Sequence, residues 1–104
     1  MTNYVFAYSG GKGVAADETE RNAQYAKRGR WFEQLGSAVV DGGAAMGSAK
    51  TVGSGGSISD GGSSGLSGYS IVSADSLDSA VELAKGCPVL EIGGAVDVYE
   101  AIAM

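Results

Sequence analysis

Glycine and serine dominate residues 42–68, and this segment constrains the fold more than any other part of the chain. Its composition offers few side chains for a core and by itself is typical of a flexible linker. Two short β-prone runs, 50–52 and 57–59, nevertheless flank Gly53-Ser54-Gly55-Gly56. Because glycines readily adopt the positive φ angles of tight turns, the pattern favours a small β-hairpin at the edge of the domain over a linker.

Before this segment the sequence predicts a strand, a helix and a second strand. Aromatic and β-branched residues at 4–8 predict the first strand. Residues 17–35 predict a helix, because acidic residues lead it, basic residues follow, and Gly36 stands where a left-handed residue would end it. Residues 38–41 predict a short strand that ends at the following glycine pair.

The first predicted helix carries large side chains along one line. They recur with helical spacing at Tyr25, Arg28, Phe32 and Leu35. Gly29 lies inside this pattern and costs roughly 1 kcal/mol relative to alanine. We therefore expect another backbone to approach the helix closely at Gly29.

After the glycine-rich segment the sequence predicts a further strand and helix. Residues 68–73 form the clearest strand, and Asp75 or Ser76 is expected to cap the helix that follows. The apolar stripe of this helix consists of Leu77, Ala80, Val81 and Ala84. Gly86 followed by Pro88 predicts where the helix ends.

Partial alternation at residues 95–102 predicts a last strand. The expected order is then strand, helix, strand, hairpin, strand, helix, strand. Without the hairpin this is the βαββαβ order of a ferredoxin-like fold. We predict one α+β domain over residues 1–104, with a small inserted glycine- and serine-rich β-hairpin and both helices on one face of an antiparallel sheet.

Both faces of this predicted sheet carry apolar side chains. In the first strand Tyr4, Phe6 and Tyr8 point to one face, while Val5 and Ala7 point to the other. A sheet face left in water is expected to alternate to polar residues. A second copy of the chain would cover the second face, so the sequence predicts a homodimer.

The charge of the chain argues against nucleic acid as a partner. The chain has seven Lys and Arg residues and a net charge of −5, whereas phosphate backbones require clustered basic side chains. Four of the basic residues fall in or near the first predicted helix, beside glutamates. That arrangement is typical of a solvated helix face and favours it over an anion-binding role.

Sequence features also predict where the protein resides. The single cysteine, Cys87, cannot form an internal disulfide, which favours a reducing compartment. Residues 1–6 lack the pattern of a secretion signal, and no apolar stretch approaches the roughly 20 residues that span a bilayer. We expect a soluble cytoplasmic protein with no membrane partner.

Several stretches, taken in their order and spacing, resemble the YCII-related family and its relatives with an Asp-Gly-Pro-Phe motif. These stretches are Trp31-Phe32-Glu33-Gln34-Leu35-Gly36, Val39-Val40-Asp41-Gly42, Asp60-Gly61, Gly68-Tyr69-Ser70-Ile71-Val72, residues 76–84, Gly86-Cys87-Pro88 and Val96-Asp97-Val98-Tyr99. The resemblance covers nearly the whole chain. It implies a ferredoxin-like fold of the dimeric α+β barrel class, in which two sheets pack together and enclose clefts.

The chain also departs from this family. Some YCII-related proteins carry a histidine and an aspartate proposed as a catalytic pair, but this chain has no histidine. Asp60-Gly61 is followed by Gly62-Ser63, so the proline and the aromatic residue of the family motif are missing. The catalytic proposal of the family therefore does not transfer to this chain.

Few residues offer recognisable chemistry. Without histidine, Ser-His and Cys-His nucleophiles and most zinc sites are excluded. Cys87 has no helix N-terminus to lower its pKa, so we interpret it as a packing residue. Ser9-Gly10-Gly11-Lys12-Gly13 lacks the ending of a phosphate-binding loop and precedes an acidic helix start. We expect no metal and no cofactor.

Six residues are candidates for lining a ligand-binding cleft. They are Tyr8, Tyr25, Trp31, Asp41, Asp60 and Tyr69. The aromatic residues could form the wall of a small-molecule pocket, and packing in the core or in a dimer explains them equally well. The two aspartates stand beside glycines, which favours a role in turns over a role as general base or hydrogen-bond acceptor in a cleft.

Two classes of function remain open. The favoured one is an accessory or small-metabolite-binding module that dimerises, because no clustered acid–base pair is visible in the sequence. The alternative is a cofactor-independent enzyme acting on a small organic acid or cyclic compound in a dimer-associated cleft. That alternative depends on analogy with other proteins of the same fold.

Overall fold

A computed structural model describes residues 1–10, 17–62 and 65–102 of the 104-residue chain. In chain order its elements are β1 (Thr2–Gly10), α1 (Glu18–Leu35), a short 3-10 helix η1 (Gly36–Ala38), β2 (Val39–Ala45), β3 (Lys50–Val52), β4 (Ile58–Asp60), β5 (Leu66–Ala74), α2 (Leu77–Ala84), a second 3-10 helix η2 (Pro88–Ile92) and β6 (Gly94–Glu100). Most of the glycine-rich loop after β1, which the sequence analysis weighed as a phosphate loop, lies outside the described residues.

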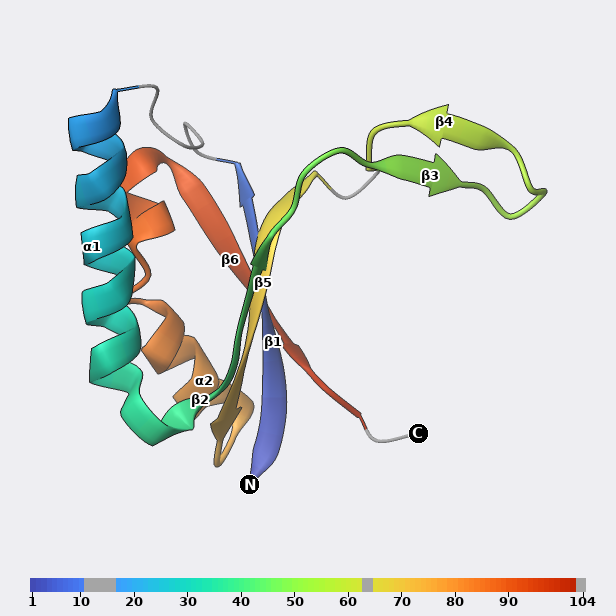
Figure 1. Cartoon of the computed structure of the whole chain (residues 1–104). Helices are drawn as coiled ribbons and strands as arrows, with labels where there is room; N and C mark the ends of the chain where they lie inside the picture. Colours follow the sequence, from blue (N-terminus) through green and yellow to red (C-terminus); the bar gives the residue numbers. More distant parts are fainter. Residues whose placement is uncertain (11–16, 63–64, 103–104) are drawn as a thin grey trace.

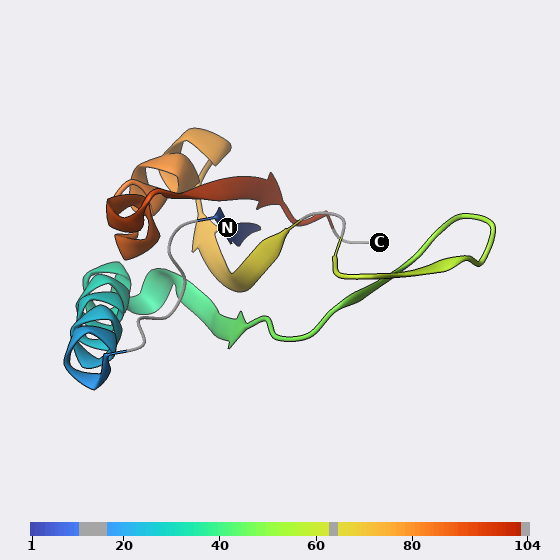
Figure 2. The same cartoon turned by 90° about the horizontal axis from the view of Figure 1, so that it is seen from above.

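Four of the strands form one antiparallel sheet in the order β2-β5-β1-β6. Both helices lie on one face of this sheet, and the β3–β4 hairpin projects away from it on the other side (Figures 1 and 2). The predictions of an α+β fold, an antiparallel sheet and helices on one face are therefore confirmed. The hairpin is confirmed too, with Lys50 opposite Asp60 and Val52 opposite Ile58, so its second strand begins one residue later than predicted.

Helix α1 has the ends that the sequence predicted. The Asp17 side chain accepts a hydrogen bond from the backbone N–H of Thr19 at 3.1 Å and caps the first turn. Gly36 ends the helix with a φ of +56°, and its N–H donates to the carbonyl of Phe32. Asp17 is thus the cap and not the first helical residue.

The side chains of α1 face differently from the prediction. Trp31 is the residue of this helix that is fully buried, whereas Tyr25 is 56% exposed. A Cβ added at Gly29 would meet no atom within 4 Å, so the expected close backbone approach there is wrong. Helical spacing alone does not show which of several adjacent lines of side chains faces the core. In this structure the line that contains Trp31 faces the core.

Helix α2 is capped by Ser76, whose side chain accepts from the N–H of Ser79 at 3.1 Å. Ala80 and Ala84 are buried as predicted. The other two members of the predicted stripe, Leu77 and Val81, are 49% and 38% exposed, so that part of the prediction is wrong. Leu83, which lies outside the predicted stripe, is instead partly buried against the core.

The core lies between the sheet and the helices. Tyr4, Phe6 and Tyr8 of β1 all point into it, which confirms the predicted alternation. The Trp31 ring stacks on Phe6 with 6.1 Å between ring centroids and meets the edge of Tyr8 at 6.4 Å. One tryptophan therefore joins α1 to the first strand.

Strand β2 is longer than predicted and irregular. It passes through Gly42 and Gly43, where the sequence analysis expected it to end, and its register with β5 shifts twice. Gly43 has a φ of +78°, and any side chain there would collide with the carbonyl oxygen of Tyr69. The glycine pair thus allows β2 to bulge against β5 and continue.

The C-terminal part differs in two respects from the prediction. The last strand is Gly94–Glu100 instead of 95–102. Pro88, interpreted only as a stop signal, begins the 3-10 helix η2, in which proline occupies a first-turn position whose N–H would have no helical partner. Neither helix of the described residues combines the length and the apolar character that a membrane crossing requires.

The second face of the sheet carries apolar side chains and no helix. Val5 lies opposite Ile71 on one side and Tyr99 on the other, and Ala7 lies opposite Tyr69 on one side and the charged residue Asp97 on the other. Tyr99 is 59% exposed. No helix of the described residues lies against this face (Figures 1 and 2).

Candidate functional site

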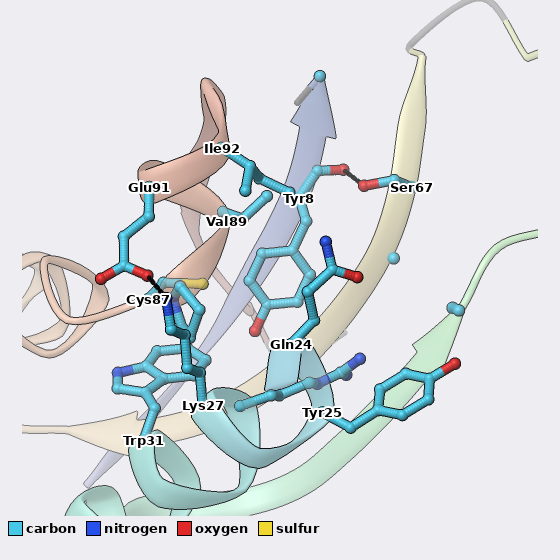
Figure 3. Close-up of a pocket in the computed structure, with 15 residues that line it drawn as sticks. Tyr8, Gln24, Tyr25, Lys27, Trp31, Ser67, Cys87, Val89, Glu91 and Ile92 are labelled. Carbon is cyan, nitrogen blue, oxygen red and sulfur yellow. Dashed lines mark hydrogen bonds and ion pairs between the residues drawn. The ribbon is translucent and has the colours of Figure 1, made fainter. Parts of the chain in front are cut away.

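A cleft of about 210 Å³ opens between α1 and η2, next to β1, β5 and the end of β2. Figure 3 shows Val89 and Ile92 of η2 beside Tyr8, with Trp31 below them next to Lys27. Tyr25 belongs to the same lining. Three of the six residues proposed from the sequence, Tyr8, Tyr25 and Trp31, are therefore brought together.

The surface of the cleft is mainly apolar. Rings from β1 and α1 form one part, and Pro88, Val89 and Ile92 form another. The indole N–H of Trp31 is not available to a ligand, because it donates to the carbonyl oxygen of Leu83 at 3.1 Å. The aromatic side chains thus offer contact area more than hydrogen bonds.

A chain of buried hydrogen bonds lies behind the aromatic wall. The Tyr8 hydroxyl donates to Ser70 Oγ at 2.8 Å, and Ser70 Oγ donates to the carbonyl oxygen of Gly42 at 2.8 Å. The order follows from chemistry: a carbonyl can only accept, so Ser70 must give it its single proton and accept from Tyr8. The Tyr8 oxygen can then only accept a further hydrogen bond from a ligand.

The two titratable groups of the cleft floor are held in their neutral forms. Burial raises the pKa of Tyr8 from its ordinary value of 10.0 to about 12, against the opposing effect of its hydrogen bond to Ser70. Burial also raises the pKa of the Cys87 thiol, although a backbone hydrogen bond at Val89 acts against it. At neutral pH neither group is a phenolate or a thiolate, so neither is an activated nucleophile.

Charged side chains stand at the rim of the cleft. Lys27 Nζ of α1 and Glu91 Oε2 of η2 form an ion pair at 3.0 Å that bridges the two helices (Figure 3). Arg28 also lines the cleft, with its guanidinium 5.3 Å from the centre of the Phe32 ring and a long hydrogen bond of 3.4 Å to Gly42 O. Burial raises the pKa values of Tyr8 and Cys87, and the positive charge of Arg28 opposes this as the weakest of the effects on each group.

The other three predicted site residues lie elsewhere. Asp41 Oδ1 accepts from the N–H of Gly43 at 2.8 Å, which is the turn role that the sequence favoured. Asp60 is exposed on the hairpin and pairs with Lys50 at 3.0 Å. Tyr69 belongs to the second face of the sheet, opposite Ala7. None of the three lines the cleft.

Most of the remaining lining residues were not predicted from the sequence. Arg28 and Gln24 lie on the same side of α1 as Trp31, at spacings of three, four and seven residues. Choosing Trp31 as the inward residue would have found both by helical periodicity. The contribution of η2 had one signal, Pro88 at a first-turn position, but nothing in the sequence indicated that η2 closes a cleft.

Within the described ranges, no group of three or more His, Cys, Asp or Glu side chains is arranged to hold a metal ion.

In comparisons with known proteins, no protein-family model matches the chain and no curated protein matches it.

Proposed function

We propose that this protein binds a small, largely apolar organic molecule in the cleft between α1 and η2. The observation that carries the proposal is the cleft itself, in which Tyr8, Trp31 and the aliphatic residues of η2 face one open volume. A volume of about 210 Å³ suits one six-membered ring with a substituent, since an engineered apolar cavity of about 150 Å³ binds benzene.

Binding is favoured over catalysis by the protonation states of the lining. Tyr8 and Cys87 are held neutral by burial. Glu91, the only carboxylate among the described lining residues, is exposed and engaged by Lys27. A cofactor-independent enzyme needs a group that exchanges a proton near neutral pH or an activated nucleophile. The described lining offers neither, so the enzyme remains the weaker alternative.

We further propose that the fold is ferredoxin-like and related to the YCII-related dimers. Two observations support this. With the hairpin set aside, strand, helix and strand occur twice, and β5 lies between β1 and β2 while β1 lies between β5 and β6. The apolar second face of the sheet, with Val5, Ile71 and Tyr99 on it, also suits the homodimer of that class.

Trp31 makes the binding proposal directly testable, because it is the only tryptophan of the chain and it lines the cleft. Titration with neutral cyclohexanemethanol and with other small ring compounds should give a saturable change in its fluorescence. The same compounds should raise the melting temperature, because a ligand of the native state stabilises it.

A pair of variants on α1 locates the binding. Gln24→Phe places a ring in the cleft lining and should weaken binding, while Asn22→Phe adds the same ring on the exposed part of the helix and should leave it unchanged. Absence of a saturable signal from every compound would overturn the proposal. Equal binding by both variants would show that the compounds bind outside the cleft.

A further inference from the structure

The positive charge of α1 is concentrated around the candidate cleft. Lys27 and Arg28 line the cleft, and Arg30 lines a second, polar hollow of about 220 Å³ beside it that shares Lys27, Trp31, Pro88 and Glu91 with the cleft. Glu91 is the one carboxylate among the described residues of both linings. In a chain with a net charge of −5, this region therefore stands out as cationic.

Two of these cations are not equivalent toward a ligand. Lys27 is already paired with Glu91 at 3.0 Å, on exposed side chains where such a pair is strongly screened. Arg28 has no carboxylate partner in the described part of the chain; its contacts are the Phe32 ring and the carbonyl oxygen of Gly42. A guanidinium carries five N–H donors in a planar fork, so these contacts leave donors for an anion.

Arg28 also lies close enough to act on the floor of the cleft. Arg28 lines the same cleft as Tyr8 and Cys87, and its positive charge acts weakly against the burial that raises the pKa of each. A negative charge at the same place would be stabilised by the same field, and more strongly than in bulk water because apolar groups surround it.

We propose that the natural ligand is a small carboxylic acid, with its ring or hydrocarbon part against Trp31 and its carboxylate on the guanidinium of Arg28. The inference rests on the proposed function and adds the chemical class of the ligand. A carboxylate suits one planar guanidinium, which it can meet with two parallel hydrogen bonds. The largely apolar walls exclude a ligand that is charged along its whole length.

Three compounds of equal shape test the charge preference. Cyclohexanecarboxylate, cyclohexanemethanol and cyclohexanemethylamine carry the same ring with a negative, neutral or positive substituent. Each compound is titrated into the protein at low ionic strength, and binding is followed by the fluorescence of Trp31. The acid should bind at least about fivefold more tightly than the alcohol, and the amine should bind most weakly. Raising the salt concentration should weaken the acid and leave the alcohol unchanged.

Two variants with equal change of net charge locate the preference. Arg28→Gln should reduce affinity for the acid about tenfold and leave affinity for the alcohol near that of the wild type. Lys85→Gln removes one positive charge just after the end of α2, where Lys85 pairs with Glu82 at 2.8 Å, and should change neither. Arg28→Lys should keep part of the acid preference, because it keeps the charge without the fork.

The outcomes separate this inference from the proposed function. Equal affinity for acid and alcohol, or tightest binding of the amine, would overturn the carboxylate assignment while the cleft stands. Failure of all three compounds to bind would overturn both. The comparison of the three compounds uses the wild-type protein, so it decides the question even where Arg28→Gln does not fold.

Discussion

Tyr8 is the residue through which the core and the candidate cleft are joined. Its ring meets Trp31 in the core, its edge lines the cleft, and its hydroxyl donates to Ser70, which is fully buried. A serine in the centre of a sheet would normally be costly. Here the cost is offset because Ser70 accepts from Tyr8 and donates to Gly42 O.

Replacing Tyr8 by phenylalanine tests this arrangement. Near neutral pH, Tyr8→Phe should lower the free energy of unfolding by about 1 kcal/mol, because Ser70 loses its donor. Urea unfolding of wild type and variant measures the difference. Tyr25→Phe, at an exposed tyrosine, should cost much less and serves as the control.

The free energies of unfolding of the wild type and of Tyr8→Phe should depend differently on pH. The pKa of Tyr8 is about 12 in the folded protein, against an ordinary value of 10.0. The phenol stabilises the folded state fully below about pH 10, and this contribution is lost as pH rises toward 12, since the unfolded chain loses its proton first. Between about pH 9 and pH 12 the wild type should lose roughly 2 kcal/mol relative to Tyr8→Phe. Parallel pH curves for the two proteins would contradict a raised pKa at Tyr8.

At the scale of elements, strand β2 continues through two glycines that have different structural roles. Gly42 supplies the carbonyl oxygen that receives both Ser70 and Arg28. Gly43 adopts a positive φ and lies against the backbone of Tyr69. The bulge between β2 and β5 thus contains Gly42, whose carbonyl oxygen is the last acceptor in the chain of hydrogen bonds from Tyr8 through Ser70.

Substitution by alanine should affect protein stability strongly at Gly43 and very little at Gly42. Gly43→Ala should destabilise the protein by roughly 3 kcal/mol or more, because the added Cβ collides with backbone and the φ is strained. Gly42→Ala should change stability by no more than about 0.5 kcal/mol, since a Cβ there meets nothing within 4 Å. Thermal and urea unfolding of the matched variants check this, and equal effects would refute the role given to the bulge.

At the scale of the whole molecule, two apolar surfaces lie away from the core. One is the second face of the sheet, with Val5, Ile71 and Tyr99. The other is the hairpin, whose cross-strand pair Val52 and Ile58 is 69% and 68% exposed. An isolated two-stranded hairpin is only marginally stable in water. The proposed homodimer would cover the second face of the sheet with the same face of its partner.

The proposed dimer predicts a specific effect at Tyr99. Tyr99→Lys places a charge on the second face and should shift the protein from dimer to monomer in sedimentation velocity, with at least about a tenfold weaker association. Leu77→Lys, at a similarly exposed apolar residue on the outside of α2, should leave the dimer intact. A wild-type protein that sediments as a monomer at micromolar concentration would overturn the homodimer.

Local sequence signals predicted most elements of the fold, and three of the six residues proposed from the sequence line the cleft. A cap at Asp75 or Ser76 and the alternation of β1 were readable because each depends on neighbouring residues only. Tyr8, Tyr25 and Trp31 were found because large aromatic side chains are rarely left without contacts. Val89 and Glu91 were not, because they matter only through the approach of η2 to α1.

The sequence by itself determined the element types, the hairpin and the two-sided apolar sheet, since periodicity and turn chemistry are properties of short segments. Only the tertiary structure decided that α1 faces the core with Trp31 and that β2 continues through Gly43. It also decided that η2 forms one side of a cleft. These depend on packing between residues far apart in the chain. A local pattern gives the spacing of side chains along an element, and contacts with the rest of the molecule decide which of them meet.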